Sequence, residues 1–164
     1  MRPHFFAILR QKCPYFVALL VEGMRRALQK GESTMGLDER RKIKELQEVT
    51  LPGRVKEIHD ICDKPIAYDV NWDSMADDPV ALNFLDNLSC HRLNMALRVI
   101  CRDDLGKQSV RDSLKSVKLK NIKDEATKQI NFQGGILEMR CAYAMGVDGA
   151  FSDGEIREIL EKGL

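Results

Sequence analysis

Two pairs of histidine and cysteine residues have the side chains that a zinc ion prefers. His59 and Cys62 stand three residues apart in a helical pattern and share one helix face, and Cys90 directly precedes His91. Structural zinc sites usually hold two cysteines on a tight C-x2-4-C turn, and neither pair has this form. Adjacent helix residues point about 100° apart, so Cys90 and His91 do not form a nucleophile and its base. We predict buried packing for these cysteines, and neither a metal nor a cofactor.

Two carboxylates on one face of an expected strand could do acid–base chemistry. Asp69 and Asp73 are four residues apart, which separates them by roughly 13 Å along an extended chain. Glycosidase carboxylates are about 5 Å apart in retaining enzymes and at most about 9.5 Å apart in inverting ones. The two residues therefore do not form a catalytic pair by themselves, although Asp77 or Asp78 could fold back toward Asp73. We expect a solvated sheet face and a helix cap here.

The acidic segment 148–155 has the composition of a calcium-binding loop but not its pattern. The EF-hand loop needs an oxygen ligand at its third position and glycine at its sixth. Counted from Asp148, these positions hold Ala150 and Asp153. Ser152 and Glu155 instead have the spacing of a capping box, in which each side chain satisfies a free amide at the start of a helix. We therefore predict a helix start and no calcium site.

A run of lysines could contact nucleic-acid phosphates, and its members are Lys115, Lys118, Lys120, Lys123 and Lys128. No aromatic residue is interleaved for base stacking, and Asp124 and Glu125 fall within the run. Lysine on an outer strand also protects a sheet from edge-to-edge aggregation. We predict that these lysines guard an edge strand or lie on a solvated face, and that the chain does not bind nucleic acid.

The composition is that of an ordinary globular chain. Lys and Arg number 26 against 25 Asp and Glu in 164 residues, so the chain lacks the charge of a general nucleic-acid or membrane-surface binder. Five cysteines without paired spacing predict free thiols in a reducing compartment, and hence a cytoplasmic location. The apolar run 15–21 is far shorter than the ~20 residues that span a bilayer, so we expect no membrane association.

The elements that must position these residues follow from hydrophobic periodicity. Alternation of apolar and polar residues predicts four strands, at about 66–72, 116–121, 129–133 and 136–144. Gly134-Gly135 predicts a hairpin between the last two, because both turn positions can take positive φ. Runs of helices and runs of strands, without strict alternation, favour an α+β fold with a mostly antiparallel sheet. We expect helices on one face of this sheet and a polar second face.

Several helices complete the predicted domain. Apolar residues keep a helical period through 37–62, with Asp38 as the expected N-cap, and at Pro52 either this helix kinks or two helices meet. Asp78 followed by Pro79 predicts another helix start. We assign residues 37–164 to one α+β domain and residues 1–36 to an N-terminal helical arm and connector, together a single structural unit.

Two functional hypotheses from different classes remain. The first is a non-enzymatic intracellular module for binding or assembly, which acts through another protein or through self-association. The arm carries a large apolar load, and a two-fold contact between arms would bury it, so we expect a homodimer. The candidate self-association residues are Phe5, Phe6, Leu9, Phe16, Leu20 and Met24.

The second hypothesis is a small enzyme or a ligand-binding protein. Its pocket would lie between the sheet and the helices, near Asp69, Trp72 and Asp73, with Arg92 or Arg102 as a basic partner. The first hypothesis is favoured because no nucleophile, metal cluster or cofactor loop is supported by its local pattern. A site assembled from distant residues leaves no such local pattern, so the choice depends on the fold.

Overall fold

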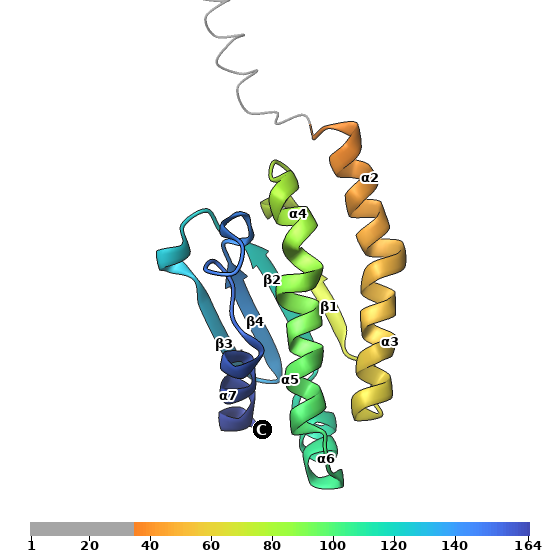
Figure 1. The fold of residues 1–164 in the computed structure, drawn as a ribbon. Coiled ribbons are helices and arrows are strands. Elements are labelled where there is room, and N and C mark those ends of the chain that lie inside the picture. Colours follow the sequence, from red (N-terminus) through yellow and green to blue (C-terminus); the bar gives the residue numbers. More distant parts are fainter. Residues whose placement is uncertain (1–34) are drawn as a thin grey trace, which may run out of the picture. The chain divides into compact units, whose positions relative to one another are not determined.

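The strands form one mixed sheet in the computed structural model, which describes residues 35–164. The strands of this part are β1 (Ala67–Val70), β2 (Ser116–Asn121), β3 (Gln129–Gln133) and β4 (Ile136–Cys141), in the spatial order β1-β2-β4-β3 (Figure 1). Both β1 and β4 run parallel to β2, and only β3 is antiparallel to its neighbour β4. The α+β class is confirmed, but the prediction of a mostly antiparallel sheet is wrong.

The connections explain the parallel pairings. Three helices lie between β1 and β2, and such a crossover returns the chain in its starting direction. The β3–β4 hairpin is as predicted, with φ of 60° at Gly134 and 85° at Gly135, the left-handed values that a two-residue turn requires. Strand β4 lies between β2 and β3. The chain reverses direction between β2 and β3 and reverses again at the hairpin, so β4 runs parallel to β2 and antiparallel to β3.

Two strands are shorter than the alternation predicts. The predicted bounds of β2 and β3 are confirmed, whereas β1 ends at Val70 and β4 at Cys141. The chain then turns into short 3₁₀ segments, Trp72–Ser74 after β1 and Tyr143–Met145 after β4. At the end of β4, the alternation of buried and exposed residues stops, because the consecutive residues Cys141, Ala142 and Tyr143 are all buried.

A long helical rod precedes the sheet. Helix α2 (Leu37–Glu45) continues through a π-helical segment, Leu46–Thr50, into α3 (Leu51–Cys62). Pro52 lies in the first turn of α3, where proline needs no backbone donor, and the wider π turn precedes it. The helix therefore passes this proline without a break (Figure 1). Gly36 stands at the N-cap with no side-chain bond, so the expected Asp38 cap is wrong.

Helices α4 (Pro79–Leu85) and α7 (Asp153–Gly163) start at the capping residues that the sequence predicts. Asp78 is the N-cap of helix α4, and its carboxylate accepts from the Ala81 amide at 2.8 Å. A π-helical segment, Asp86–His91, joins α4 to α5 (Arg92–Ile100). Helix α6 (Asp104–Ser113) leads into β2. The capping box that starts α7 (Asp153–Gly163) is confirmed, with Ser152 and Glu155 bonded in both directions.

The helices of residues 35–164 cover one face of the sheet. Figure 1 shows α3, α5 and α7 over the same face, and the core lies between them and the sheet. The sheet residues on this side are fully or almost fully buried: Val117, Leu119, Leu137 and Met139. The alternate residues Lys118 and Lys120 are exposed on the opposite face, which we call the open face. The predicted division into a covered and a polar face is confirmed.

The predicted N-terminal arm, residues 1–36, falls almost wholly outside the described residues. The same holds for every candidate self-association residue: Phe5, Phe6, Leu9, Phe16, Leu20 and Met24. Self-association through these side chains therefore stays a prediction.

Candidate functional site

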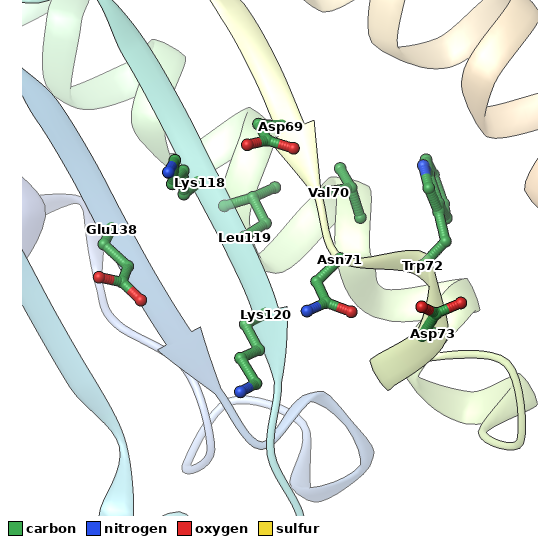
Figure 2. A pocket seen from close by; sticks show the side chains of 9 residues that line it. All are labelled: Asp69, Val70, Asn71, Trp72, Asp73, Lys118, Leu119, Lys120 and Glu138. Atoms are coloured by element: carbon green, nitrogen blue, oxygen red, sulfur yellow. The ribbon is translucent and has the colours of Figure 1, made fainter.

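A hollow of about 440 Å³ lies on the open face, beside the end of β1 and the middle of β2 (Figure 2). We call it the open-face hollow. Three acidic residues and two lysines contribute side chains, and the middle of β2 forms the floor. The Trp72 side chain lies across β1 from them, beside Val70, and packs partly against the core. The lining residues are Asp69, Val70, Asn71, Trp72, Asp73, Lys118, Leu119, Lys120 and Glu138. The carboxyl ends of parallel strands are a common position for binding sites, because the following loops gather there.

Strand register sets the order of the charges in the open-face hollow. Asp69 of β1 is opposite Lys118 of β2, which in turn is opposite Glu138 of β4. This row alternates in sign across the three parallel strands. Arg140 donates to the Glu138 carboxylate at 2.8 Å, so the charge of Glu138 is already compensated within the sheet. Asp69 and Lys118 are therefore the residues of this row whose charged groups can bind another molecule.

The loop after β1 forms one wall of the hollow, and a buried asparagine fixes it. Asn121, at the end of β2, donates from its side chain to the Ser74 carbonyl at 3.2 Å and to Asp78 at 3.1 Å. Its backbone amide also donates to the Ser74 hydroxyl at 3.0 Å. Asn71 accepts from the Ser74 amide and closes the 3₁₀ turn that carries Trp72 and Asp73. These contacts hold Trp72 and Asp73 against the sheet.

Four charged side chains around the hollow have no partner within residues 35–164. They are Asp69, Asp73, Lys118 and Lys120, which make no side-chain hydrogen bond or ion pair with any residue of this part. All four are exposed. Their hydrogen-bonding groups are consequently free for a molecule that enters the hollow, at a small desolvation cost.

The structure corrects the position of the predicted pocket. Asp69, Trp72 and Asp73 line one hollow as predicted, but it lies on the open face and not between the sheet and the helices. The expected separation along a straight strand does not apply, because the strand ends at Val70. Arg92 does not line the hollow, since it donates to the Phe151 carbonyl at 2.8 Å.

The basic residues of the hollow are lysines that sequence analysis assigned differently. Arg102 is absent from its lining, and Lys118 and Lys120 supply the positive charge instead. Their strand, β2, lies between β1 and β4, so the prediction that they guard an outer strand is wrong and the solvated-face alternative holds. Alternation with Val117 and Leu119 already places the lysines on the polar face. Only the parallel register with β1 shows that Lys118 is opposite Asp69.

A second group of charges lies on the other side of the sheet, among the helices. The guanidinium of Arg54 in α3 donates two parallel bonds to Asp86, at 2.8 and 2.9 Å, and a third to Glu57 at 2.9 Å. Glu57 also accepts from Asn94 at 2.8 Å and from Arg98 at 2.6 Å. We call these five residues the helix-side network. No local sequence pattern predicts it, because its members lie up to 44 positions apart, from Arg54 to Arg98.

The helix-side network shifts the pKa values of its members. The hydrogen bonds to Asp86 raise the pKa of Arg54 above its ordinary value. Burial alone would raise the pKa of Glu57, but the bonds from Arg98, Asn94 and Arg54 outweigh it and lower that pKa to about 2. Tyr68 of β1 joins the network to the sheet by donating to Asn94 at 3.0 Å, and burial raises the pKa of its hydroxyl. The network is therefore a structural tie between α3, α5 and β1.

The other predicted sites give the following outcome. The burial predicted for Cys62 and Cys90 is confirmed, Cys141 is buried as well, and all three are free thiols. Within residues 35–164, no three histidine, cysteine or acidic residues lie together in a way that could hold a metal ion. In the same part of the chain, no helix is long and apolar enough to cross a membrane. None of the protein-family models, curated proteins or solved structures compared with the chain matches it.

Proposed function

We propose that this chain is a non-enzymatic binding module that holds a segment of a partner protein in the open-face hollow. The observation that supports the proposal is the set of two unpartnered acids and two unpartnered lysines around one hollow of about 440 Å³. This arrangement complements a polypeptide segment that carries both basic and acidic side chains. A ligand whose charges are all of one sign would be repelled by two of these four residues.

The hollow favours modest affinity. Each exposed ion pair contributes about 0.2–1 kcal/mol, so four of them cannot by themselves give tight binding. Trp72 stands in the loop beside the hollow, where its half-buried side chain packs partly against the core and is close enough to sense a bound molecule. We expect dissociation constants of about 1–100 µM that weaken as salt is added.

Openness favours binding over catalysis at this site. Enzymes stabilise developing charge with donors fixed in a site from which water is excluded. The charged groups of Asp69, Asp73, Lys118 and Lys120 are exposed to solvent and are not fixed by bonds to neighbouring side chains of residues 35–164. They can adapt to a partner's charges, which suits recognition better than transition-state stabilisation.

The proposal is tested by peptide selection with a matched pair of variants. A library of random twelve-residue peptides displayed on phage is selected on the full chain. The open-face variant carries Asp69→Asn, Asp73→Asn, Lys118→Gln and Lys120→Gln. The control variant removes two acids and two bases from exposed ion pairs of α2 and α3, and carries Asp38→Asn, Arg41→Gln, Lys56→Gln and Asp60→Asn. Both variants keep the net charge of the chain.

We expect selection to give a peptide consensus with basic and acidic positions. The control variant should bind such a peptide as the natural chain does, and the affinity of the open-face variant should be at least about tenfold lower. Tenfold corresponds to about 1.4 kcal/mol, which a few exposed ion pairs can supply together. Selection without a consensus would contradict the proposal. So would a consensus that the open-face variant binds as well as the natural chain does.

Self-association is a separate proposal that depends on the N-terminal residues. The apolar side chains between residues 5 and 28 are numerous enough to form a two-fold contact. Light scattering on the full chain and on a chain that starts at Leu37 tests it. We expect a dimer for the first and a monomer for the second. A monomeric full chain at roughly tens of micromolar, or a dimeric shortened chain, would refute the proposal.

A further inference from the structure

Two cysteines that are far apart in the sequence meet at one end of the helical layer. Cys62 is the last residue of α3, and Cys101 is the residue that ends α5. Their sulfur atoms lie 2.9 Å apart. Cys62 is fully buried, whereas Cys101 is 5% exposed, so solvent reaches the pair at Cys101. The two thiols are thus already in contact, with one of them accessible to a very small reagent.

Two basic side chains and one carboxylate lie near this pair. Asp63, which follows Cys62 in the left-handed conformation at φ 59°, accepts from Lys107 at 3.2 Å and from Arg111 at 3.4 Å. These bonds hold the basic face of α6 beside the two sulfur atoms. A cation beside a thiol favours the thiolate, which is the reactive form of cysteine.

The two thiols differ in acidity. The hydrogen bond with Cys62 lowers the pKa of Cys101 below its ordinary value against the cost of burial. Lys107 and Arg111 act in the same direction, and Asp63 opposes them. The pKa of Cys62 is raised, first by its hydrogen bond with Cys101 and also by burial. Cys101 therefore has the character of the attacking thiolate, and Cys62 that of the thiol that follows.

We propose that Cys62 and Cys101 are a reversible redox pair, which a small peroxide converts from two thiols in contact to a disulfide that joins the ends of α3 and α5. In the first step the Cys101 thiolate attacks one oxygen of hydrogen peroxide, the O–O bond breaks, and the departing hydroxide takes a proton to become water. Cys101 is then a sulfenic acid.

In the second step the sulfur of Cys62 attacks the sulfur of Cys101. The S–S bond forms as the S–O bond breaks, and the departing hydroxide takes the proton of Cys62 to become a second water. The two thiols lose two electrons in total, and the peroxide accepts them. A dithiol reductant reverses the change by thiol–disulfide exchange.

The remaining described cysteines provide an internal comparison. Burial raises the pKa of Cys90 above its ordinary value and that of Cys141 to about 11. Neither thiol is bonded to another sulfur atom within residues 35–164. Both should stay reduced under conditions that oxidise the Cys62–Cys101 pair, because little thiolate is present and no second thiol is in place to resolve a sulfenic acid.

Peptide mapping of the full chain tests the proposal. The reduced protein is treated with a small excess of hydrogen peroxide, alkylated under denaturing conditions and digested without reductant. We expect a peptide pair linked through Cys62 and Cys101, which dithiothreitol removes. Because the bond closes a loop of about 40 residues, the oxidised chain should melt roughly 5–15 °C higher than the reduced chain.

Two variants separate this pair from general oxidation. Cys90→Ala should keep both the linked peptide and the rise in melting temperature, and Cys62→Ala should lose both. The mapping of the natural chain is decisive on its own if Cys62→Ala does not fold. Recovery of Cys62 and Cys101 as thiols after peroxide treatment would overturn the proposal, and so would a disulfide that uses Cys90 or Cys141 in preference to this pair.

Discussion

Charged residues lie on both sides of the sheet, and the two sides use them differently. On the covered side, the helix-side network gives every carboxylate and guanidinium a partner, with Arg54 and Asp86 joined by two parallel bonds. On the open side, Asp69, Asp73 and Lys118 stand around a hollow with no partner in the described part of the chain. The contrast indicates that the first group contributes to stability and the second to recognition.

Solvent exposure is the physical reason for the difference. The side chains of Arg54, Asp86 and Glu57 are only 24–26% exposed, so a partner lost from this network would leave a charge poorly solvated. An exposed charge that loses or lacks a partner is hydrated by water instead, at almost no cost. Substitutions on the two sides should therefore separate cleanly in their effects on unfolding.

The largest effect is expected for Arg54→Ala. This change leaves Asp86 and Glu57 as neighbouring carboxylates without the guanidinium between them, and we expect it to lower the free energy of unfolding by about 2–4 kcal/mol. Urea unfolding measures the loss. Arg41→Ala is the matched control, because Arg41 pairs with Asp38 at an exposed site, and it should change stability by less than about 0.5 kcal/mol. Equal effects of the two changes would remove the distinction between the two sides.

Acid should weaken the helix-side network through Glu57. Its pKa is about 2 in the folded chain against an ordinary 4.5, so its contribution is complete above pH 4.5 and is lost as the pH falls toward 2. With an allowance for solvent screening, we expect about 1–2 kcal/mol from this group. The measurement is the urea midpoint of the natural chain and of Glu57→Gln between pH 5 and pH 2. Parallel pH profiles of the two would show that Glu57 is not the responsible group.

A capping box shows that an exposed group can still stabilise when its geometry is fixed. Ser152 accepts from the Glu155 amide at 3.2 Å, and the Glu155 carboxylate accepts from the Ser152 amide at 2.8 Å. The bonds from Ser152 lower the pKa of Glu155. Ser152→Ala should cost about 0.5–2 kcal/mol, because the start of α7 loses its side-chain acceptor. An unchanged urea midpoint for this variant would mean that the cap contributes nothing to stability.

The smallest effect on stability is expected on the open face. The open-face variant should unfold within about 0.5 kcal/mol of the natural chain, because its four substitutions remove no ion pair in the described residues and preserve side-chain size. Its urea midpoint is compared with that of the control variant. A loss of several kcal/mol would show that the charges around the hollow serve the fold and not a partner.

Local patterns in the sequence predicted the parts of the fold that depend on neighbouring residues. The Gly134-Gly135 hairpin, the Ser152–Glu155 capping box and the bounds of β2 and β3 are correct because each depends on a few consecutive residues. The parallel pairings were missed, because strand order depends on how the chain crosses between distant segments.

For the candidate site, too, local patterns predicted the position of single residues but not the contacts between distant segments. Alternation placed Lys118 and Asp69 on polar strand faces, and this much is correct. Their meeting at one hollow depends on the register between β1 and β2, which no local pattern contains. The contact between Cys62 and Cys101 likewise joins the ends of two helices that only the packing of α3 against α5 brings together.

The central claim is tested most directly by the fluorescence of Trp72, which is the sole tryptophan of the sequence and lines the open-face hollow. A peptide obtained by selection on the full chain is titrated into the natural chain, the open-face variant and the control variant. We predict a saturable change in Trp72 emission for the natural chain and the control variant, and a midpoint shifted at least about tenfold for the open-face variant. An emission change that is absent from the natural chain, or equal in all three proteins, would contradict binding in the open-face hollow.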